Sequence, residues 1–123
     1  RSDIEMEQLG YVGFSWGSAI APVMLATEVR IKVSVLISGG LMLQSTQPEV
    51  DPFNFLPRTR AATLMINVQN DYFYPLESSQ KPFFHFLAAA PKSSVLLKGG
   101  HLPPMNDIAR ETLDWLDRYP PSQ

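Results

Sequence analysis

The stretch LGYVGFSWG, residues 9–17, decides the fold. It opens with a short apolar run typical of a strand, and the residues after it carry apolar side chains at helical spacing up to residue 28. Between the two, GFSWG at residues 13–17 matches the pattern G-x-S-x-G. Chance alone gives such a match in roughly a few per cent of chains of this length. The match becomes informative because a predicted strand precedes it and a predicted helix follows it. The stretch predicts a strand, a tight turn at Ser15 and a helix over residues 8–28.

A turn of this kind restricts the residues around the serine. The serine is held in a strained backbone conformation, and the residues two positions away on either side have to lack a Cβ that would meet the strand and the helix. Gly13 and Gly17 meet that demand. The turn would lift the Ser15 hydroxyl above the sheet and aim the backbone N–H of Trp16, at the positive end of the helix, toward a bound carbonyl oxygen. A Gly-rich turn with a helix-capping serine is the alternative interpretation.

Apolar segments alternate along the rest of the chain. Most of the 11 prolines fall between these segments, where proline ends elements, although Pro22 is expected to kink the first helix. Continuous apolar strands that alternate with helices indicate a parallel sheet of about four strands with helices on both faces, an α/β fold in a single domain over residues 1–123. The further elements predicted are strand 33–38, loop 39–62, strand 63–68, helix 76–89, strand 94–98 and helix 104–119.

The composition excludes several classes of protein. The chain is 45% hydrophobic with a net charge of −2, which excludes intrinsic disorder and offers no basic surface for nucleic acid or an anionic membrane. It has no cysteine, so a disulfide scaffold, a thiolate nucleophile and a cysteine-ligated metal are excluded. No apolar run approaches the ~20 residues of a membrane span. We expect no cofactor and no metal, and the sequence favours the cytoplasm only slightly over other compartments.

The long loop over residues 39–62 allows two interpretations. Ordered loops of about two dozen residues are uncommon unless they are functional, so the loop lines a site or is a surface excursion with a short helical turn.

Two residues beyond Ser15 are candidates for its chemistry. A serine hydroxyl needs a base to become a nucleophile, and the base needs a carboxylate to hold it. His101 follows strand 94–98, and Asp71 follows strand 63–68. Because the carboxyl ends of parallel strands meet at one edge, Ser15, Asp71 and His101 are expected to converge there.

Each candidate has a competing interpretation. His85, the other histidine, lies in an apolar helical segment and suits a structural role on a helix. Asp71 suits a turn, Glu77 is the reserve acid or an early helix residue that serves the helix dipole, and His101 is otherwise a loop histidine without a role.

Five segments of the chain together carry a family resemblance: GFSWG at 13–17, DPFNFLP at 51–57, NDYFYPLESSQ at 70–80, GGHLPP at 99–104 and ETLDWLDRY at 111–119. They resemble the carboxyl-terminal half of an α/β-hydrolase, nearest to the dienelactone-hydrolase and prolyl-oligopeptidase-like esterases. The resemblance implies that Ser15 is the nucleophile, Asp71 the acid, His101 the general base and Trp16 the backbone oxyanion donor. It also places Ser18 where many members have glycine or another small residue.

The chain differs from this family in the part that precedes the strand and turn that carry Ser15. In the family about half of the central sheet comes before that strand, and a loop in that earlier part supplies a second oxyanion N–H. Strand 9–14 would be left with a bare apolar edge, which tends to recruit another chain. We expect self-association through that edge, or an amino-terminal partner segment. The start at Arg1, without an initiator Met, fits a chain cut within a larger fold.

Two functional hypotheses follow. The first is a serine hydrolase of carboxylic esters, or of lactones or peptides, that works through an acyl-enzyme on Ser15. The second is a truncated module that does not catalyse and instead self-associates or binds an amino-terminal segment. The residues Phe73, Tyr74 and Leu102 are candidates for an apolar pocket wall, although aromatic residues near strand ends also suit a core. A metal hydrolase has no ligand cluster at a recognised spacing.

Overall fold

The computed structural model describes residues 8–42 and 46–121. The start of the chain at Arg1 and residues 43–45 of the predicted loop lie outside this part. The elements in chain order are β1 (Leu9–Phe14), α1 (Trp16–Ala19), α2 (Ala21–Thr27), β2 (Ile31–Ile37), the 3-10 helix η1 (Pro52–Arg58), β3 (Ala62–Val68), the π-helix η2 (Leu76–Gln80), α3 (Lys81–Phe86), β4 (Lys92–Leu97) and α4 (Met105–Arg118). Within the described residues, no helix has the length and apolarity to cross a membrane.

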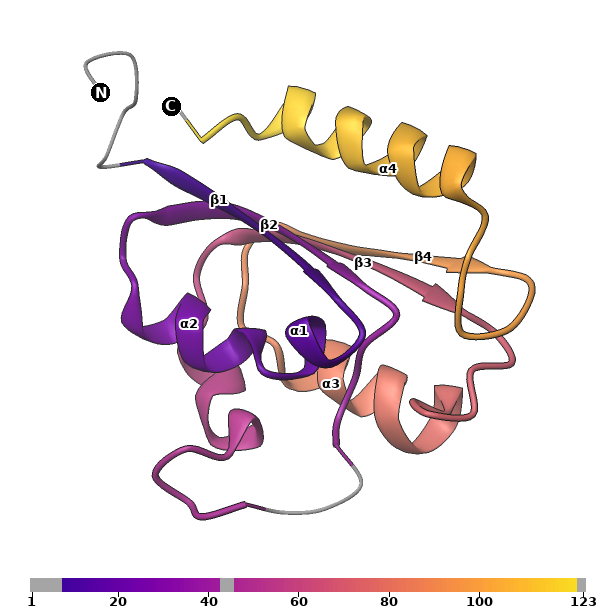
Figure 1. Ribbon diagram of the computed structural model, residues 1–123. Coiled ribbons are helices and arrows are strands. Elements are labelled where there is room, and N and C mark those ends of the chain that lie inside the picture. The colour runs from indigo at the N-terminus through magenta and orange to yellow at the C-terminus, as the bar shows by residue number, and fades with distance from the viewer. Residues whose placement is uncertain (1–7, 43–45, 122–123) are drawn as a thin grey trace.

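The four strands form one parallel sheet in the order β1-β2-β3-β4. This confirms the predicted α/β class and sheet (Figure 1). β2 and β3 are interior strands, and every residue of β3 is buried. Because all four strands run the same way, their carboxyl ends meet at one edge of the sheet.

The sheet separates two hydrophobic cores. On one face α2, η1 and α3 bury Leu25, Leu56 and Phe83 against strand residues that include Leu36. On the other face α4 buries Trp115 against the alternate positions of β2 and β3. Successive strand side chains point to opposite faces, so each interior strand contributes to both cores. Figure 1 shows α4 alone on one side of the sheet and the other helices on the opposite side, as predicted.

The helix after the turn differs from the single kinked helix that the sequence predicts. The structure has two helices, α1 and α2, with Ile20 between them. Pro22 lies in the first turn of α2, where its missing N–H has no helical partner to lose. The proline therefore begins a second helix, and the expected kink is a complete break.

The predicted helix 76–89 is also wrong in its bounds and type. It begins as the π-helix η2 and ends at Phe86. Past that point the N–H of Ala88 donates to the Leu56 carbonyl at 3.1 Å. The Lys92 ammonium donates to the Phe84 carbonyl at 2.6 Å and to the Leu87 carbonyl at 2.9 Å. The last carbonyls of α3 thus find donors outside the helix, and the N–H of Ala88 bonds to Leu56 and not to a helical carbonyl, so the helix ends here.

The loop predicted over residues 39–62 contains the helical turn that one of its two interpretations anticipates. Asp51 caps η1 by accepting the Phe53 N–H at 3.0 Å, and η1 buries Phe55 and Leu56 in the core beneath α2. The second half of the loop is therefore part of the fold and not a detached excursion.

Trp115 is the main anchor of α4. Its side chain is buried, and its indole N–H donates to the Ala62 carbonyl at 3.2 Å. We expect Trp115→Ala to lower the free energy of unfolding by about 3–5 kcal/mol, because it removes a large buried side chain and leaves a carbonyl without its donor. Urea denaturation measures this loss. The matched control Leu113→Ala, on the exposed side of α4, should stay within about 0.5 kcal/mol of wild type; equal losses in both would contradict the assignment of Trp115 as the anchor.

Candidate active site

Ser15 lies in the turn between β1 and α1 in a conformation that L-residues avoid. Its φ is 55° and its ψ is −113°, a type of strain that costs of order 1–3 kcal/mol and persists only where the surroundings enforce it. The Ser15 N–H donates to the Ile37 carbonyl at 2.7 Å, and the Ser15 carbonyl accepts from Ser18 and Ala19 at 3.0 and 3.1 Å. These bonds enforce the turn, which is the one predicted for the G-x-S-x-G sequence.

The steric demand on the two flanking glycines is confirmed at one and wrong at the other. A Cβ on Gly13 would lie 2.8 Å from the Gly17 carbonyl oxygen, closer than real contacts allow. A Cβ on Gly17 would meet only the Tyr11 hydroxyl at 4.0 Å. Gly17 is inside α1, and apart from that hydroxyl the space beside its Cα is open to a side chain. The strand end, and not the helix, is therefore the crowded side of the turn.

This asymmetry gives a matched pair of variants. Gly13→Ala should lose about 1–3 kcal/mol of stability, because the new methyl group is forced against backbone atoms. Gly17→Ala should keep or slightly raise the stability, because alanine favours the helix. Thermal melts followed by circular dichroism compare the two. Equal destabilisation by both substitutions would contradict the asymmetry.

Ser18 does more than fill a position for a small residue. It is fully buried, and its hydroxyl lies 2.8 Å from the Gly13 carbonyl and 2.9 Å from the Ile37 carbonyl. One hydroxyl proton is shared between these acceptors. Ser18 thereby bonds α1 to the ends of β1 and β2, in the turn that carries Ser15.

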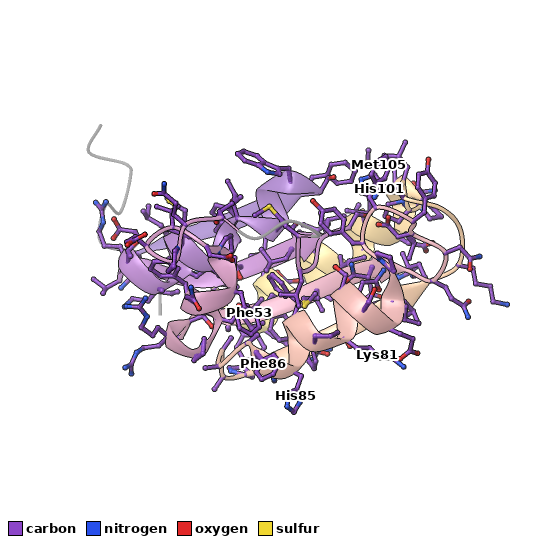
Figure 2. The ribbon with its side chains drawn as sticks, turned by 90° about the horizontal axis from the view of Figure 1, so that it is seen from below. Phe53, Lys81, His85, Phe86, His101 and Met105 are labelled. Carbon is purple, nitrogen blue, oxygen red and sulfur yellow. The ribbon has the colours of Figure 1, made fainter. Side chains whose placement is uncertain are left out.

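Three residues from three strand ends form a continuous hydrogen-bonded chain. The Ser15 Oγ lies 2.8 Å from Nε2 of His101, and Nδ1 of His101 lies 2.7 Å from Oδ2 of Asp71. The Asp71 side chain is completely buried, and that of His101 is 18% exposed. The convergence predicted for Ser15, Asp71 and His101 is what the structure shows, and Figure 2 places His101 close to the start of α4 at Met105.

The buried carboxylate of Asp71 is satisfied on both oxygens. Its Oδ1 accepts the N–H groups of Phe73 and Tyr74 at 2.9 and 3.1 Å, while Oδ2 faces His101. Gln80 then fixes the turn from behind, because its amide donates to the Val68 and Tyr74 carbonyls at 2.9 and 2.8 Å. A buried polar group is tolerated when it is hydrogen-bonded, and these bonds also fix the orientation of the Asp71 carboxylate.

Aromatic rings surround the His101 imidazole. The Phe73 and Phe14 ring centroids lie 4.9 and 5.8 Å from it, and the Tyr74 ring stacks at 6.1 Å. Burial raises the pKa of Tyr74, a hydrogen bond with the Ser15 hydroxyl lowers it in part, and the Asp71 charge raises it further. The net direction is upward, so Tyr74 stays a neutral phenol beside Ser15 at neutral pH.

The three candidate pocket residues differ in burial and in their distance from the catalytic candidates. Tyr74 is buried next to Ser15 and His101, Phe73 is half exposed over the imidazole, and the side chain of Leu102 is 75% exposed. An apolar cavity of about 300 Å³ lies beside Trp16, the residue after Ser15. It is lined by residues of α1, α2 and the loop, chiefly Trp16, Ile20, Val23, Met24, Met42 and Pro52.

The reserve candidates do not join the site. His85 is exposed on α3, and Figure 2 shows it on a different side of the molecule from His101. Glu77 is exposed and pairs with Lys81 at 2.6 Å. Both take the structural interpretations that the sequence left open.

Trp16 is the first residue of α1. An N–H at that position has no acceptor within the helix and is available to a ligand. The indole itself is 64% exposed beside the cavity. The role of the Trp16 N–H as an oxyanion donor stays a prediction.

Sequence reasoning missed Ser38, whose hydroxyl donates to the carbonyl of His101 at 2.7 Å. The signal was present, because Ser38 directly follows β2 at the same carboxyl-terminal edge that selected Asp71 and His101.

Comparison with known proteins bears on the fold. The sequence matches no protein-family model, and a search of curated proteins finds no match. Solved structures do match. A cold-adapted esterase from an Arctic intertidal metagenomic library superposes with a TM-score of 0.73 at 22% identity, over 89% of this chain and 48% of that one. An esterase of Pyrococcus furiosus gives 0.74 at 15% identity, over 92% and 54%. The fold of this chain is therefore that of about half of an α/β-hydrolase.

The acylaminoacyl peptidase of Pyrococcus horikoshii shares this fold as well. It superposes with a TM-score of 0.77 at 17% identity, over 98% of this chain and 25% of that one. The chain thus spans about half the length of the α/β-hydrolase esterases and a quarter of the peptidase. These likenesses establish the fold and leave the chemistry to the site.

Proposed function

We propose that this chain acts as a serine hydrolase on carboxylic esters. The observation that carries the proposal is the chain of hydrogen bonds from Ser15 through His101 to the buried Asp71, at 2.8 and 2.7 Å. Nucleophile, base and carboxylate in this order and at these distances are what acyl transfer requires. Esterases and a peptidase among the structures with this fold agree with the proposal.

The reaction follows from the contacts of His101. Its Nε2 takes the Ser15 proton as Oγ attacks the acyl carbon, and Asp71 holds the ring so that Nδ1 carries a proton and the imidazolium is stabilised. The Trp16 N–H donates to the oxyanion of the tetrahedral intermediate. The alkoxide leaves with the proton from Nε2, and an acyl-enzyme remains on Ser15. Water then gives a proton to Nε2 and attacks the acyl carbon. The Ser15 Oγ leaves the resulting tetrahedral intermediate with that proton, which releases the acid and restores the Ser15 hydroxyl and the neutral imidazole.

The surroundings of Ser15 favour a substrate with an apolar group. The cavity beside Trp16 is lined mainly by aliphatic side chains and methionines, and Phe73 covers the other side of His101. We therefore propose an apolar acyl or alcohol group in the cavity. Lactones and peptides are the further substrates that the same nucleophile would attack.

Replacement of the nucleophile tests this proposal. We expect slow hydrolysis of a small activated ester, lost by roughly 10⁴-fold or more in Ser15→Ala, and labelling of wild type but not of the variant by a fluorophosphonate probe. The matched control is Ser34→Ala, since Ser34 is a buried serine that bonds Thr63 at 2.8 Å inside the sheet. Equal hydrolysis by wild type and Ser15→Ala would overturn the assignment of the nucleophile.

The edge of the sheet favours a second candidate function, that of an assembly module. β1 is an edge strand, and its side chains Val12 and Phe14 are 58% and 44% exposed, close in sequence to the exposed Trp16. An apolar strand with unpaired backbone groups is a template for another strand. We propose that this edge pairs with a second copy of the chain or with an amino-terminal partner segment, and that the pairing completes the oxyanion site.

For the chain on its own, the available partner is a second copy. Sedimentation velocity should then show association in the high micromolar range, and Val12→Glu should weaken it, because a charge on the exposed side of β1 opposes pairing. Leu113→Glu, on the exposed side of α4, should have no effect. A clean monomer at these concentrations would contradict self-association.

A further inference from the structure

Ser38 ends β2 in the same way that Ser15 ends β1. It is completely buried and has a φ of 54°. Its N–H donates to the Ile66 carbonyl at 2.8 Å, which holds the backbone to β3. Its hydroxyl donates to the carbonyl of His101 at 2.7 Å. A buried side chain of β2 thus reaches across the sheet edge to the backbone of the residue that contacts Ser15.

The presence of serine at this φ is itself informative. A left-handed φ favours glycine, which pays no penalty for a Cβ, and Gly39 and Gly40 follow immediately. Strain in a residue other than glycine persists where the surroundings over-determine it, and such positions cluster at functional sites. The feature that distinguishes serine from glycine here is a hydroxyl, and that hydroxyl is bonded to His101.

The segment that follows Ser38 is fixed from three sides. The Gly39 carbonyl accepts the Asn67 amide at 2.8 Å, and the Leu41 carbonyl accepts the Ser79 hydroxyl at 2.7 Å. A Cβ on Gly39 would lie 2.3 Å from the Cβ of Ser18, so the backbone packs directly on the turn below Ser15. Residues 38–41 therefore form a rigid brace that touches the nucleophile turn, the strand before Asp71 and the π-helix after it.

The loop that carries His101 has much less support of its own. Gly99 has a φ of 122°. A Cβ added to Gly99 or to Gly100 would meet no neighbouring atom of the described residues within 4 Å, so none of them packs against the backbone on that side. On the other side of His101, Leu102 is exposed and the loop is next anchored at the buried Pro103. The Asn70 N–H donates to the Gly99 carbonyl at 3.2 Å, which ties the start of the loop. The hydrogen bond from the Ser38 hydroxyl therefore connects the rigid brace to the backbone of His101 itself.

We propose that Ser38 is a positioning residue for the reaction, which sets the distance of the His101 imidazole from Ser15 by holding the His101 carbonyl. The inference rests on the proposed hydrolase function for its kinetic consequence. An error of about 1 Å in the place of a base can cost of order 10²-fold in rate without a change in substrate contacts. Loss of the Ser38 hydroxyl is therefore expected to lower kcat and to leave KM nearly unchanged.

Ser38→Gly is the direct test, because glycine accepts the left-handed φ and removes only the hydroxymethyl group. We expect kcat for the activated ester to fall roughly 10- to 100-fold, with KM within about 2-fold of wild type. Ser38→Cys, which keeps the shape and offers a weak donor, should be intermediate. The control Ser34→Ala removes a buried hydroxyl from the same strand, away from His101, and should keep the wild-type kcat. Thermal melts confirm that each variant is folded.

A spectroscopic measurement separates this inference from the proposed function. In a His85→Gln background, which leaves His101 as the sole histidine, the Nδ1 proton shared with Asp71 should give a strongly deshielded NMR signal. The signal should shift or broaden in Ser38→Gly and stay in Ser34→Ala. Absence of Ser15-dependent hydrolysis in wild type would overturn the proposed function and leave this measurement intact. A folded Ser38→Gly with wild-type kcat and an unchanged signal would overturn the positioning role.

Discussion

The site depends on a backbone conformation that appears twice, at the ends of two neighbouring strands. Phe14 and Ile37 face each other across the β1–β2 pair, and the next residue in each strand is a serine with φ near +55°. Each left-handed turn stops its strand abruptly and directs a hydroxyl out of the sheet edge. Ser15 contacts the imidazole of His101 and Ser38 contacts its carbonyl. One residue on a weakly supported loop is therefore held at both its side chain and its backbone by two rigid strand ends.

Buried hydrogen bonds beneath the site offset the free-energy cost of this arrangement. Strained serines and a fully buried carboxylate all oppose folding, each by an amount of order kilocalories per mole. They are stable because their polar groups are paired: the N–H groups of Ser15 and Ser38 donate to carbonyls of β2 and β3, and the carboxylate accepts on both oxygens. The Asp71 oxygens have three donors, and Ser18 satisfies carbonyls of two strands at once. Stability and site geometry are thus properties of the same hydrogen bonds.

The sequence predicts the features that follow from periodicity and from the carboxyl-end rule of parallel sheets. The strand positions, the parallel sheet and the meeting of Ser15, Asp71 and His101 all follow from those two arguments. Ser38 obeys the same rule and was missed, because a serine before two glycines also suits an ordinary turn. The early end of α3 depends on Leu56 and Lys92, which lie far along the chain. The π-helix at residues 76–80 is likewise bonded through Ser79 to the distant Leu41. Local patterns do not contain that information.

The two edges of the sheet differ in a way that bears on how the site is completed. β4 begins with Lys92 and two serines, and the Lys92 ammonium covers the end of α3. Leu96 further along β4 is 49% exposed, but charge and polarity at the start of the strand discourage further pairing. β1 presents Val12 and Phe14 and no charge. Trp16 follows the end of β1 at the start of α1, so a strand paired beyond β1 would end near the proposed oxyanion donor. The edge that favours association is therefore next to the proposed catalytic site.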